Sequence, residues 1–350
     1  MQKIINLTPP SLDAENIKEK ITCVRAHRER LFAVYSEFKD GKLICHNYGQ
    51  GGAGWTFLFG CVNESIRQFE QQLSLAQSYK NKPICVIGAG CYGLLTATIL
   101  ARAGYQVRIV AANVHSIASY KAAGFFFPRW RKCSNEQEIA TFLARGMESY
   151  KTYVDIIQGK HPFIMHGPKL LPAYYGVDID PGFAPYIAQG LVAQPEAVRI
   201  TFGNHKIYDA HKYYSIFVNG GVIMEELQRN IAELDITITQ HTIENFNELD
   251  ESIIFNCAGL GAKQLANDQK IIPVQGHLIA LHNQPIEQLQ YMINVKVVQT
   301  DSYGKRDELI YFAPKGEGIL GITFKRGQDS LTSNAHEFER LLNRCNTFFR

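Results

Sequence analysis

The sequence predicts an α/β fold with two parts, and three observations support this prediction. A short apolar run ends in the glycine cluster GAGCYG and is followed by a helical pattern and a second apolar run, which is the order of a Rossmann-like strand–turn–helix–strand unit. Several apolar runs after residue 252 indicate a second, mixed or antiparallel sheet. Another glycine cluster, GQGGAG, occupies residues 49–54 and precedes the first. Two such clusters in one chain suggest that both approach one ligand.

Composition narrows the class of protein. The chain has 350 residues, of which 46% are hydrophobic and 20% charged, as in ordinary globular proteins. The formal net charge of +3 is too small to predict a nucleic-acid partner. No apolar run has the length of a membrane span, and the N-terminal segment lacks the apolar core of a signal peptide. We therefore expect a cytoplasmic protein without a nucleic-acid or membrane partner.

The cysteines give a consistent expectation. None of the eight is spaced as a metal ligand, and several stand in apolar runs, where a thiol acts as a small hydrophobic group. We predict no metal site and a reducing compartment.

The elements before the first apolar strand of the Rossmann-like unit follow from turn signals and periodicity. They are a short helix (13–20), two strands (31–38 and 42–48), a glycine loop (46–54), a long helix (56–76) and a polar linker (78–83). Asp40-Gly41 between the two strands is a strong hairpin signal. The long helix is predicted because its apolar residues lie mainly on one side.

The remaining elements are predicted in the same way. They are a strand (83–87), a helix (91–103), a strand (105–112), a loop (122–130), a helix (135–158), an irregular region (159–205), a helix (211–232), strands near 236–240 and 252–257, strands of an antiparallel sheet between 274 and 324, and a final helix (334–347). Gly104 is the expected C-cap of the helix that begins at residue 91.

The GAGCYG cluster has the features of a dinucleotide site. Gly88 permits a tight turn, Gly90 lets a pyrophosphate approach the backbone, and Gly93 lets the helix pack closely on the strand. The helix N-terminus adds N–H groups and partial positive charge. Ala89 and Tyr92 complete the predicted contact set at this turn. The competing interpretation, a glycine turn without a ligand, does not account for the flanking strand, helix and second strand.

One expected feature is missing. The strand that follows the helix should end in an acidic residue for the ribose hydroxyls, but this chain has Asn113 near that point. The absence disfavours a nicotinamide dehydrogenase. A later apolar run ends in Cys-Ala-Gly, and its Gly259 is predicted to allow a second close backbone approach to the dinucleotide.

Taken together, these segments resemble the D-amino-acid oxidase family of FAD-dependent oxidoreductases. The segments that carry the resemblance are VIGAGCYGLLTATILARAGYQVRIV, SIASYKAAGFFFPRW with its small residues Ala122, Ala123 and Gly124, IIFNCAGLGAKQL followed by IIPVQGHLIAL, ELIYFAPKGEGILGITFKRG, and HNYGQGGAGWT. The resemblance implies FAD as cofactor, a Rossmann-like FAD-binding domain and a substrate domain with a mixed or antiparallel sheet.

The order of these segments departs from the family. HNYGQGGAGWT and the preceding VRAHRERLFAVYSE resemble motifs that the family carries near its C-terminus, whereas here they come first. We therefore predict a circular permutation, in which the usual first strand follows at Pro83. The alternative, a separate N-terminal domain, would leave one hairpin and one helix with unpartnered apolar faces.

The expected domains are discontinuous. Residues 46–133 plus 210–265 form the FAD-binding domain, and residues 1–45 plus 134–209 plus 266–350 form the substrate-binding domain.

The resemblance also assigns roles. The flavin takes a hydride from the substrate Cα on N5, and the chain supplies binding and orientation. Arg25 aligns with the carboxylate-binding arginine and Tyr311 with the tyrosine that assists it. The carbonyl of Gly52 accepts the substrate amine, and Gln50 tunes specificity. The residues expected around the flavin ring are Gly51, Gly52, Gly54, Trp55 and Thr56.

Several neighbouring residues compete for these roles. Arg28 and Arg30 are alternative carboxylate partners, and Ala26 stands where the family has proline. An acidic substrate would need a second cation, for which Arg129, Arg131 or Arg28 are candidates. Tyr303 is a loose match to the family's lid tyrosine. His46 is expected to orient the glycine loop and not to act as a base.

The leading hypothesis is an enzyme that oxidises an amino acid, first of all a D-amino acid, with O2 as electron acceptor. The alternatives are a glycine, sarcosine or other secondary-amine oxidase or dehydrogenase of the same fold, and a flavin-binding protein without catalysis. The expected partners are a small amino-acid or amine substrate and O2. A homodimer is left open.

Overall fold

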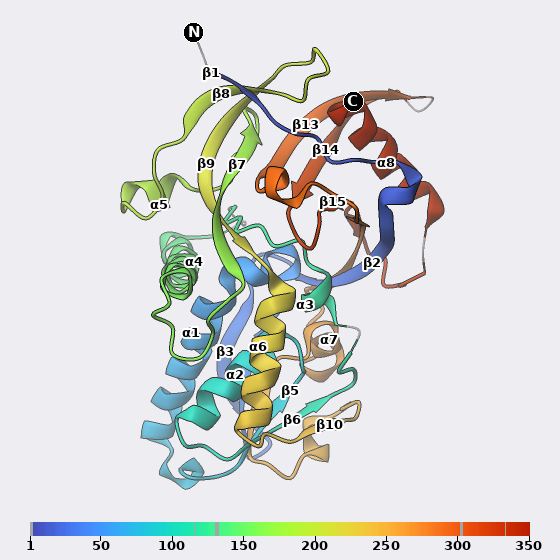
Figure 1. Ribbon diagram of the computed structural model, residues 1–350. Coiled ribbons are helices and arrows are strands. Elements are labelled where there is room, and N and C mark those ends of the chain that lie inside the picture. Colours follow the sequence, from blue (N-terminus) through green and yellow to red (C-terminus); the bar gives the residue numbers. More distant parts are fainter. Residues whose placement is uncertain (1–2, 116, 130–132, 302–303, 333) are drawn as a thin grey trace.

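Two β-sheets organise the computed structural model, which describes residues 3–115, 117–129, 133–301, 304–332 and 334–350. The six-stranded sheet and its helices occupy the lower half of Figure 1, and the ten-stranded sheet occupies the upper half. The predicted α/β fold with a second, mixed sheet is confirmed.

The six-stranded sheet is the Rossmann-like part. Its strands, in spatial order, are β10 (Ile238–Gln240), β6 (Val107–Ala111), β5 (Ile84–Ile87), β11 (Ile253–Asn256), β4 (Lys42–Tyr48) and β3 (Ala33–Lys39). The first five are parallel to their neighbours, and β3 pairs antiparallel with β4. The predicted hairpin turn is confirmed, because Asp40 and Gly41 have φ angles of 50° and 71°.

The register of this sheet positions the site. Strand β11 lies between β4 and β5, with Asn256 beside both His46 and Ile87. All residues of β5 and β11 are buried, as expected for parallel strands covered on both faces. The three strands therefore end at one edge of the sheet.

Helices cover the sheet on one face, and a loop region covers the other. Helices α1 (Gly54–Leu75), α2 (Cys91–Arg102), α4 (Glu136–Ile157) and α6 (Gly220–Glu233) share one apolar core with the sheet. The other face packs against η4 (Phe246–Glu248), its flanking residues and α7 (Ala262–Leu265). The predicted C-cap at Gly104 is confirmed by its φ of 91°.

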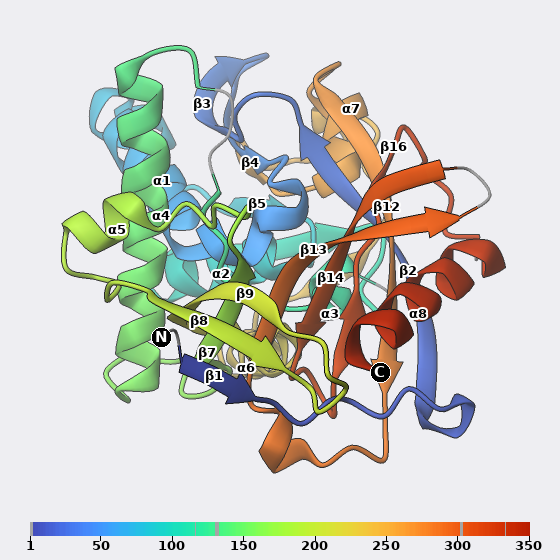
Figure 2. The same cartoon turned by 90° about the horizontal axis from the view of Figure 1, so that it is seen from above.

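The ten-stranded sheet is mixed. Its strands are β1 (Lys3–Asn6), β8 (Glu196–Thr201), β9 (Tyr208–Val218), β7 (Pro168–Gly176), β13 (Met292–Asp301), β14 (Gly304–Ala313), β15 (Ile319–Gly321), β12 (Ile271–Leu281) and β16 (Lys325–Arg326), with β2 (Ile17–Arg28) paired along β12. Helix α8 (Ala335–Phe349) packs on β12, β14 and β15. Figure 2 shows α8 beside β2 on this side of the molecule.

The shorter elements lie in connections. They are the helices α3 (Ala118–Lys121) and α5 (Ala184–Ala188) and the 3-10 turns η1 (Ala14–Asn16), η2 (Gly51–Ala53), η3 (Gln77–Tyr79), η5 (Gly259–Gly261) and η6 (Ile286–Leu289). Among the described residues, no helix is both long and apolar enough to cross a membrane.

Three predicted elements are wrong. Residues 13–20 form one 3-10 turn and the start of β2, residues 211–218 belong to β9, and the region 159–205 contains β7, α5 and β8. In each case, pairing with a distant strand decides the conformation, which local propensity does not detect.

Sheet membership differs from the predicted domain boundaries at two places. Residues 33–45 join the six-stranded sheet through β3 and β4, and β9 belongs to the ten-stranded sheet. The physical reason is that β4 pairs with β11, so the hairpin is fixed by the six-stranded sheet.

The close approach of α1 and α4 gives a stability prediction. A Cβ on Gly60 would lie 1.9 Å from the carbonyl oxygen of Arg145, whereas one on Gly221 in α6 would meet nothing closer than 3.5 Å. Gly60→Ala should lower the free energy of unfolding by about 3 kcal/mol or more, the upper range for overpacking. Gly221→Ala should leave it unchanged or raise it by up to about 1 kcal/mol, since alanine favours helices. Urea unfolding checks both, and equal stability of the two variants would contradict the assigned helix contact.

Candidate functional site

Three glycine-bearing turns meet at the edge where β4, β5 and β11 end. They are residues 49–54 after β4, residues 88–90 after β5 and residues 257–261 after β11. All three line one cavity of about 1360 Å³. Drug-sized pockets hold roughly 300–1000 Å³, so this cavity has room for a larger ligand such as a dinucleotide.

The turn after β5 has the geometry predicted for a phosphate-binding turn. Gly88 has a φ of 108°, and a Cβ there would lie 2.5 Å from the carbonyl oxygen of Cys257. Gly93 does not line the cavity; a Cβ on it would lie 1.8 Å from the Gly88 oxygen, so its role is close packing of α2. Ala89, Gly90 and Tyr92 line the cavity.

The glycine loop after β4 is tied to α2. The Tyr92 hydroxyl donates a hydrogen bond to the Gly54 carbonyl over 2.9 Å. The loop needs glycine at Gly49 and Gly51, whose φ angles are 89° and 61°. Gly51, Gly52, Gly54 and Trp55 line the cavity, as predicted. This hydrogen bond holds the two predicted glycine clusters at one site.

The side chain of Thr56 supports the neighbouring loop. It does not line the cavity; its hydroxyl donates to the carbonyl of Phe125 over 3.4 Å and accepts from the N–H of Phe127 at 3.0 Å. Thr56 therefore fixes the small-residue loop, of which Ala122, Ala123 and Gly124 line the cavity.

Asn113 and Gly259 lie where the sequence predicts. Both line the cavity. The side chain of Asn113 accepts a hydrogen bond from the backbone N–H of His115 at 3.0 Å. Next to it the chain after β10 contributes His241, whose backbone N–H bonds to the Ala111 carbonyl.

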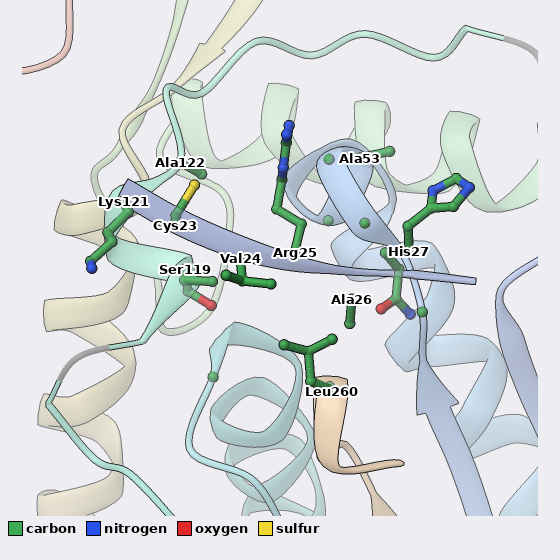
Figure 3. Close-up of a pocket in the computed structure, with 18 of the residues that line it drawn as sticks. Cys23, Val24, Arg25, Ala26, His27, Ala53, Ser119, Lys121, Ala122 and Leu260 are labelled. Atoms are coloured by element: carbon green, nitrogen blue, oxygen red, sulfur yellow. The ribbon is translucent and has the colours of Figure 1, made fainter. Parts of the chain in front are cut away.

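Arg25 brings a buried cation to the same cavity. It lies on β2 with 9% of its surface exposed. Figure 3 shows Cys23, Arg25 and His27 on one side of the strand, with Val24 and Ala26 on the other, toward Leu260. Nη2 of Arg25 donates to the Thr323 carbonyl over 2.9 Å. The phenyl ring of Phe324 lies 4.6 Å from the guanidinium.

No carboxylate pairs with Arg25 in the described part of the chain. Burial lowers the pKa of its guanidinium, while Cys23 and Tyr311 nearby oppose that shift. Because burying a cation is costly unless an anion compensates, this position suits a ligand carboxylate.

Tyr311 and Gln50 also line the cavity. The Tyr311 ring stacks on Phe125 with the centroids 4.1 Å apart, and burial raises its pKa well above the usual value, so the hydroxyl stays a donor. The Gln50 amide donates to the Asn47 side chain over 2.9 Å.

The competing arginines differ in their surroundings. Arg28 pairs with Asp268 at 2.6 Å, and Tyr48 bonds to the same carboxylate, so Arg28 is engaged in the loop structure. Arg30 is largely exposed and lies 3.5 Å from Glu138. Arg129 lines the cavity, whereas Arg131 and Tyr303 lie outside the described residues.

His46 lies behind the site. It is fully buried, does not line the cavity, and bridges Glu37 at 3.1 Å and Asn256 at 3.2 Å. Burial lowers its pKa. The ring of His46 therefore links β4 to both of its neighbours, β3 and β11.

Comparison with protein families decides the assignment. The model of the FAD dependent oxidoreductase family matches residues 83–350, which is most of the chain. The chain belongs to this family. Its cofactor is therefore FAD, and it is an oxidoreductase.

Similar proteins include D-amino-acid oxidases. The chain is 24% identical over 267 residues to "D-amino-acid oxidase" of Streptomyces coelicolor, with 75% of this chain and 76% of that protein covered. It is also 24% identical to "D-amino-acid oxidase" of Dictyostelium discoideum, covering 57% of each. Among solved structures, glycine oxidase from Bacillus cereus has a TM-score of 0.56 at 18% identity, covering 76% of this chain and 79% of that one. At this identity the structural likeness shows the fold.

The cavity fits the FAD of this family. Gly90 has an ordinary φ of −76°, so the backbone does not require glycine there, yet a side chain would enter the lined space. The turns at 88–90 and 257–261 would hold the dinucleotide phosphates, and the loop 51–55 would face the ring. The Cys91 N–H at the start of α2 already donates to Ser119 Oγ at 3.1 Å.

Sequence reasoning missed three contributors to this site. Ser119 accepts that Cys91 bond, and its carbonyl receives the Trp55 indole N–H at 3.3 Å. Lys315 donates to the carbonyls of Tyr120 and Ala122, which holds the small-residue loop, and burial lowers its pKa to about 8. Gly276 leaves room for Arg25, since a Cβ there would lie 2.7 Å from Nη2. All three residues stand in segments that carry the family resemblance, but no role at the site was predicted for any of them.

Filling the phosphate turn should separate folding from cofactor binding. Gly90→Val keeps an allowed backbone but puts a branched side chain into the cavity. FAD affinity should fall about 10- to 100-fold, equivalent to an overpacking cost of about 1–3 kcal/mol. Fluorescence titration of the apoprotein with FAD measures this, and circular dichroism checks that the variant is folded. A folded variant with unchanged affinity would exclude Gly90 from the contact set.

Proposed function

We propose that the protein oxidises an amino acid, with D-amino acids as the first candidates, to the imino acid, and that O2 takes up the electrons. Bound FAD supplies the hydride acceptor, N5, for the hydrogen on the substrate Cα. The observation that carries the proposal is the buried Arg25, without an acidic partner in the described part of the chain, at the cavity formed by the three glycine turns.

Arg25 and Tyr311 would bind the substrate carboxylate. A guanidinium can hold a carboxylate through two parallel hydrogen bonds. Tyr311 keeps its proton, because burial raises its pKa, and can donate a further bond. The two side chains come from separate strands, β2 and β14, so the carboxylate is fixed relative to the sheet.

The amine would lie near the glycine loop. A Cβ placed on Gly52 would be 3.5 Å from Nη1 of Arg25, so the loop runs beside the guanidinium. The carbonyl of Gly52 can then accept from a neutral amine, and no protein base is needed if the amine enters deprotonated. Positioning of Cα would supply most of the rate enhancement. Gln50 borders the same space and would tune specificity.

Four outcomes of one assay separate the candidate functions. Bleaching of the flavin by D-amino acids under nitrogen, with recovery in air, supports the proposed oxidase. Bleaching by glycine or sarcosine alone assigns a glycine- or secondary-amine oxidase, and bleaching without recovery in air assigns a dehydrogenase. No bleaching by any amino acid or amine assigns a flavin-binding protein without turnover.

Removing the cation should weaken carboxylate recognition. Arg25→Ala should lower kcat/KM by the equivalent of about 2–5 kcal/mol, as for truncating one partner of a buried charged pair. Arg25→Lys should lose less, since it keeps the charge but not the bidentate geometry. Arg229→Ala, at an exposed position of α6 that does not line the cavity, serves as control. Steady-state kinetics on the active amino acid measures all three, and unchanged kinetics in Arg25→Ala would overturn the assignment.

We also propose that the chain is circularly permuted relative to its family. The family match begins at residue 83, next to β5, and the HNYG strand β4 lies parallel to β11 in the same sheet. The C-terminal residue lies near the start of the chain, because Arg350 pairs with Asp13 at 2.7 Å. We also propose the division into an FAD-binding domain and a substrate-binding domain, each of which is assembled from segments that are separate in this chain.

Relinking the chain tests the permutation. A protein that begins at Pro83, runs to Arg350 and continues through a Gly/Ser linker into residues 3–78 should fold and bind FAD, because each segment keeps its place. Absorbance at the flavin bands and thermal unfolding measure this. As a control, the chain is cut at Gly203 instead. The proposal is contradicted if the protein cut at Gly203 binds FAD and the relinked protein does not.

A further inference from the structure

We propose that Thr323 and Phe324 are positioning residues for Arg25, and that His277 and helix α8 hold these two residues in place from behind. The proposal rests on the function proposed for Arg25 and names the part of the chain that sets its geometry. We call residues 322–325, which follow β15 and end at the first residue of β16, the holder segment.

The front of the holder segment contacts the guanidinium twice. The Thr323 carbonyl accepts from Nη2 of Arg25 at 2.9 Å, and the Phe324 ring lies 4.6 Å from the guanidinium carbon. Phe324 is 60% exposed although it is a large apolar residue, and it lines the cavity. An exposed ring at this place covers the cation while leaving the other guanidinium edge to a ligand.

The side chain of Thr323 is fixed by His277. The backbone N–H of His277 donates to Thr323 Oγ1 at 3.1 Å, and its Nδ1 lies 2.7 Å from the same oxygen. The backbone N–H thus donates to the hydroxyl oxygen, and the tautomer of His277 decides which partner donates in the contact with Nδ1. Burial lowers the pKa of His277, which favours the neutral ring.

Helix α8 holds both ends of the holder segment. Nη2 of Arg344 donates to the Ile322 carbonyl at 3.1 Å, and Nζ of Lys325 pairs with Glu337 at 2.6 Å. Arg344 is itself almost fully buried and pairs with Glu308 on β14. A hydrogen bond to the Ile322 carbonyl and an ion pair to Lys325 therefore restrain the backbone at both ends of the holder segment.

These contacts explain why the unpaired Arg25 stays extended toward the cavity. Gly276 lies opposite the holder segment and leaves a slot because it has no side chain. A Cβ on Gly276 would lie 2.7 Å from Nη2 of Arg25 and 3.1 Å from the Thr323 carbonyl oxygen. The guanidinium is held between this slot, the Thr323 carbonyl and the Phe324 ring. Carboxylate affinity should therefore depend on residues that do not touch the carboxylate.

Acetate binding to the FAD-loaded protein tests the proposal, with acetamide as the neutral control ligand. Flavin absorbance reports both titrations. Thr323→Val removes the hydroxyl at constant shape and should weaken acetate about five- to tenfold, the equivalent of one hydrogen bond. Thr323→Ser keeps the hydroxyl and should therefore bind acetate as tightly as the wild type. Phe324→Leu, at an exposed position that does not endanger folding, should weaken acetate about two- to fivefold. The affinity for acetamide should change less than about twofold in each variant.

Thr152→Val is the matched control variant, because it too removes a hydroxyl that makes a hydrogen bond, here to the Glu148 carbonyl, but on α4 outside the cavity. It should leave acetate binding unchanged. The proposal is overturned if Phe324→Leu and Thr323→Val both bind acetate as the wild type does, or if acetamide weakens equally. Arg25→Ala separates the two proposals: if acetate binding survives it, the function proposed for Arg25 is wrong, and if only that variant fails, the holder segment alone is wrong.

Discussion

The placement of β11 between β4 and β5 is the constraint on which the site depends. Each of these strands ends in a glycine-bearing turn, and the in-register pairing of Asn256 with His46 and Ile87 brings the three turns to one edge. Ligands of open α/β sheets bind at the carboxyl ends of the strands. A shift of register by one residue would exchange the side chains of β11 between the two covered faces of the sheet, so the packing on both faces and the site geometry are fixed together.

A second constraint is electrostatic. The cavity is lined mainly by small and apolar residues, and its buried cation Arg25 donates to backbone carbonyls and lies against the Phe324 ring. Such a cation favours an anionic group strongly, because water is largely excluded from it. Burying a cation without an acidic partner lowers the stability of the fold. The packed surroundings of β12, β16 and α8 offset this cost and hold the cation in place.

The sequence predicted the parts whose chemistry is local. The glycine turns, the Asp40-Gly41 hairpin and the C-cap at Gly104 each require a particular backbone conformation, and glycine or a turn residue marks it in the sequence. Ser119, Lys315 and the holder segment could not be found in this way, because their roles arise from contacts between residues far apart in the chain. β9 was mistaken for helix for the same reason, since its partners β7 and β8 precede it in irregular-looking sequence.

The position of β4 also has a consequence for how the chain is made. During synthesis the hairpin β3–β4 and helix α1 emerge early, but the inner edge of β4 pairs with β11, which comes more than two hundred residues later. Until then that edge and the apolar face of α1 lack their final partners. Open strand edges invite pairing with other chains, so β4 stays open to intermolecular pairing until β11 has been synthesised.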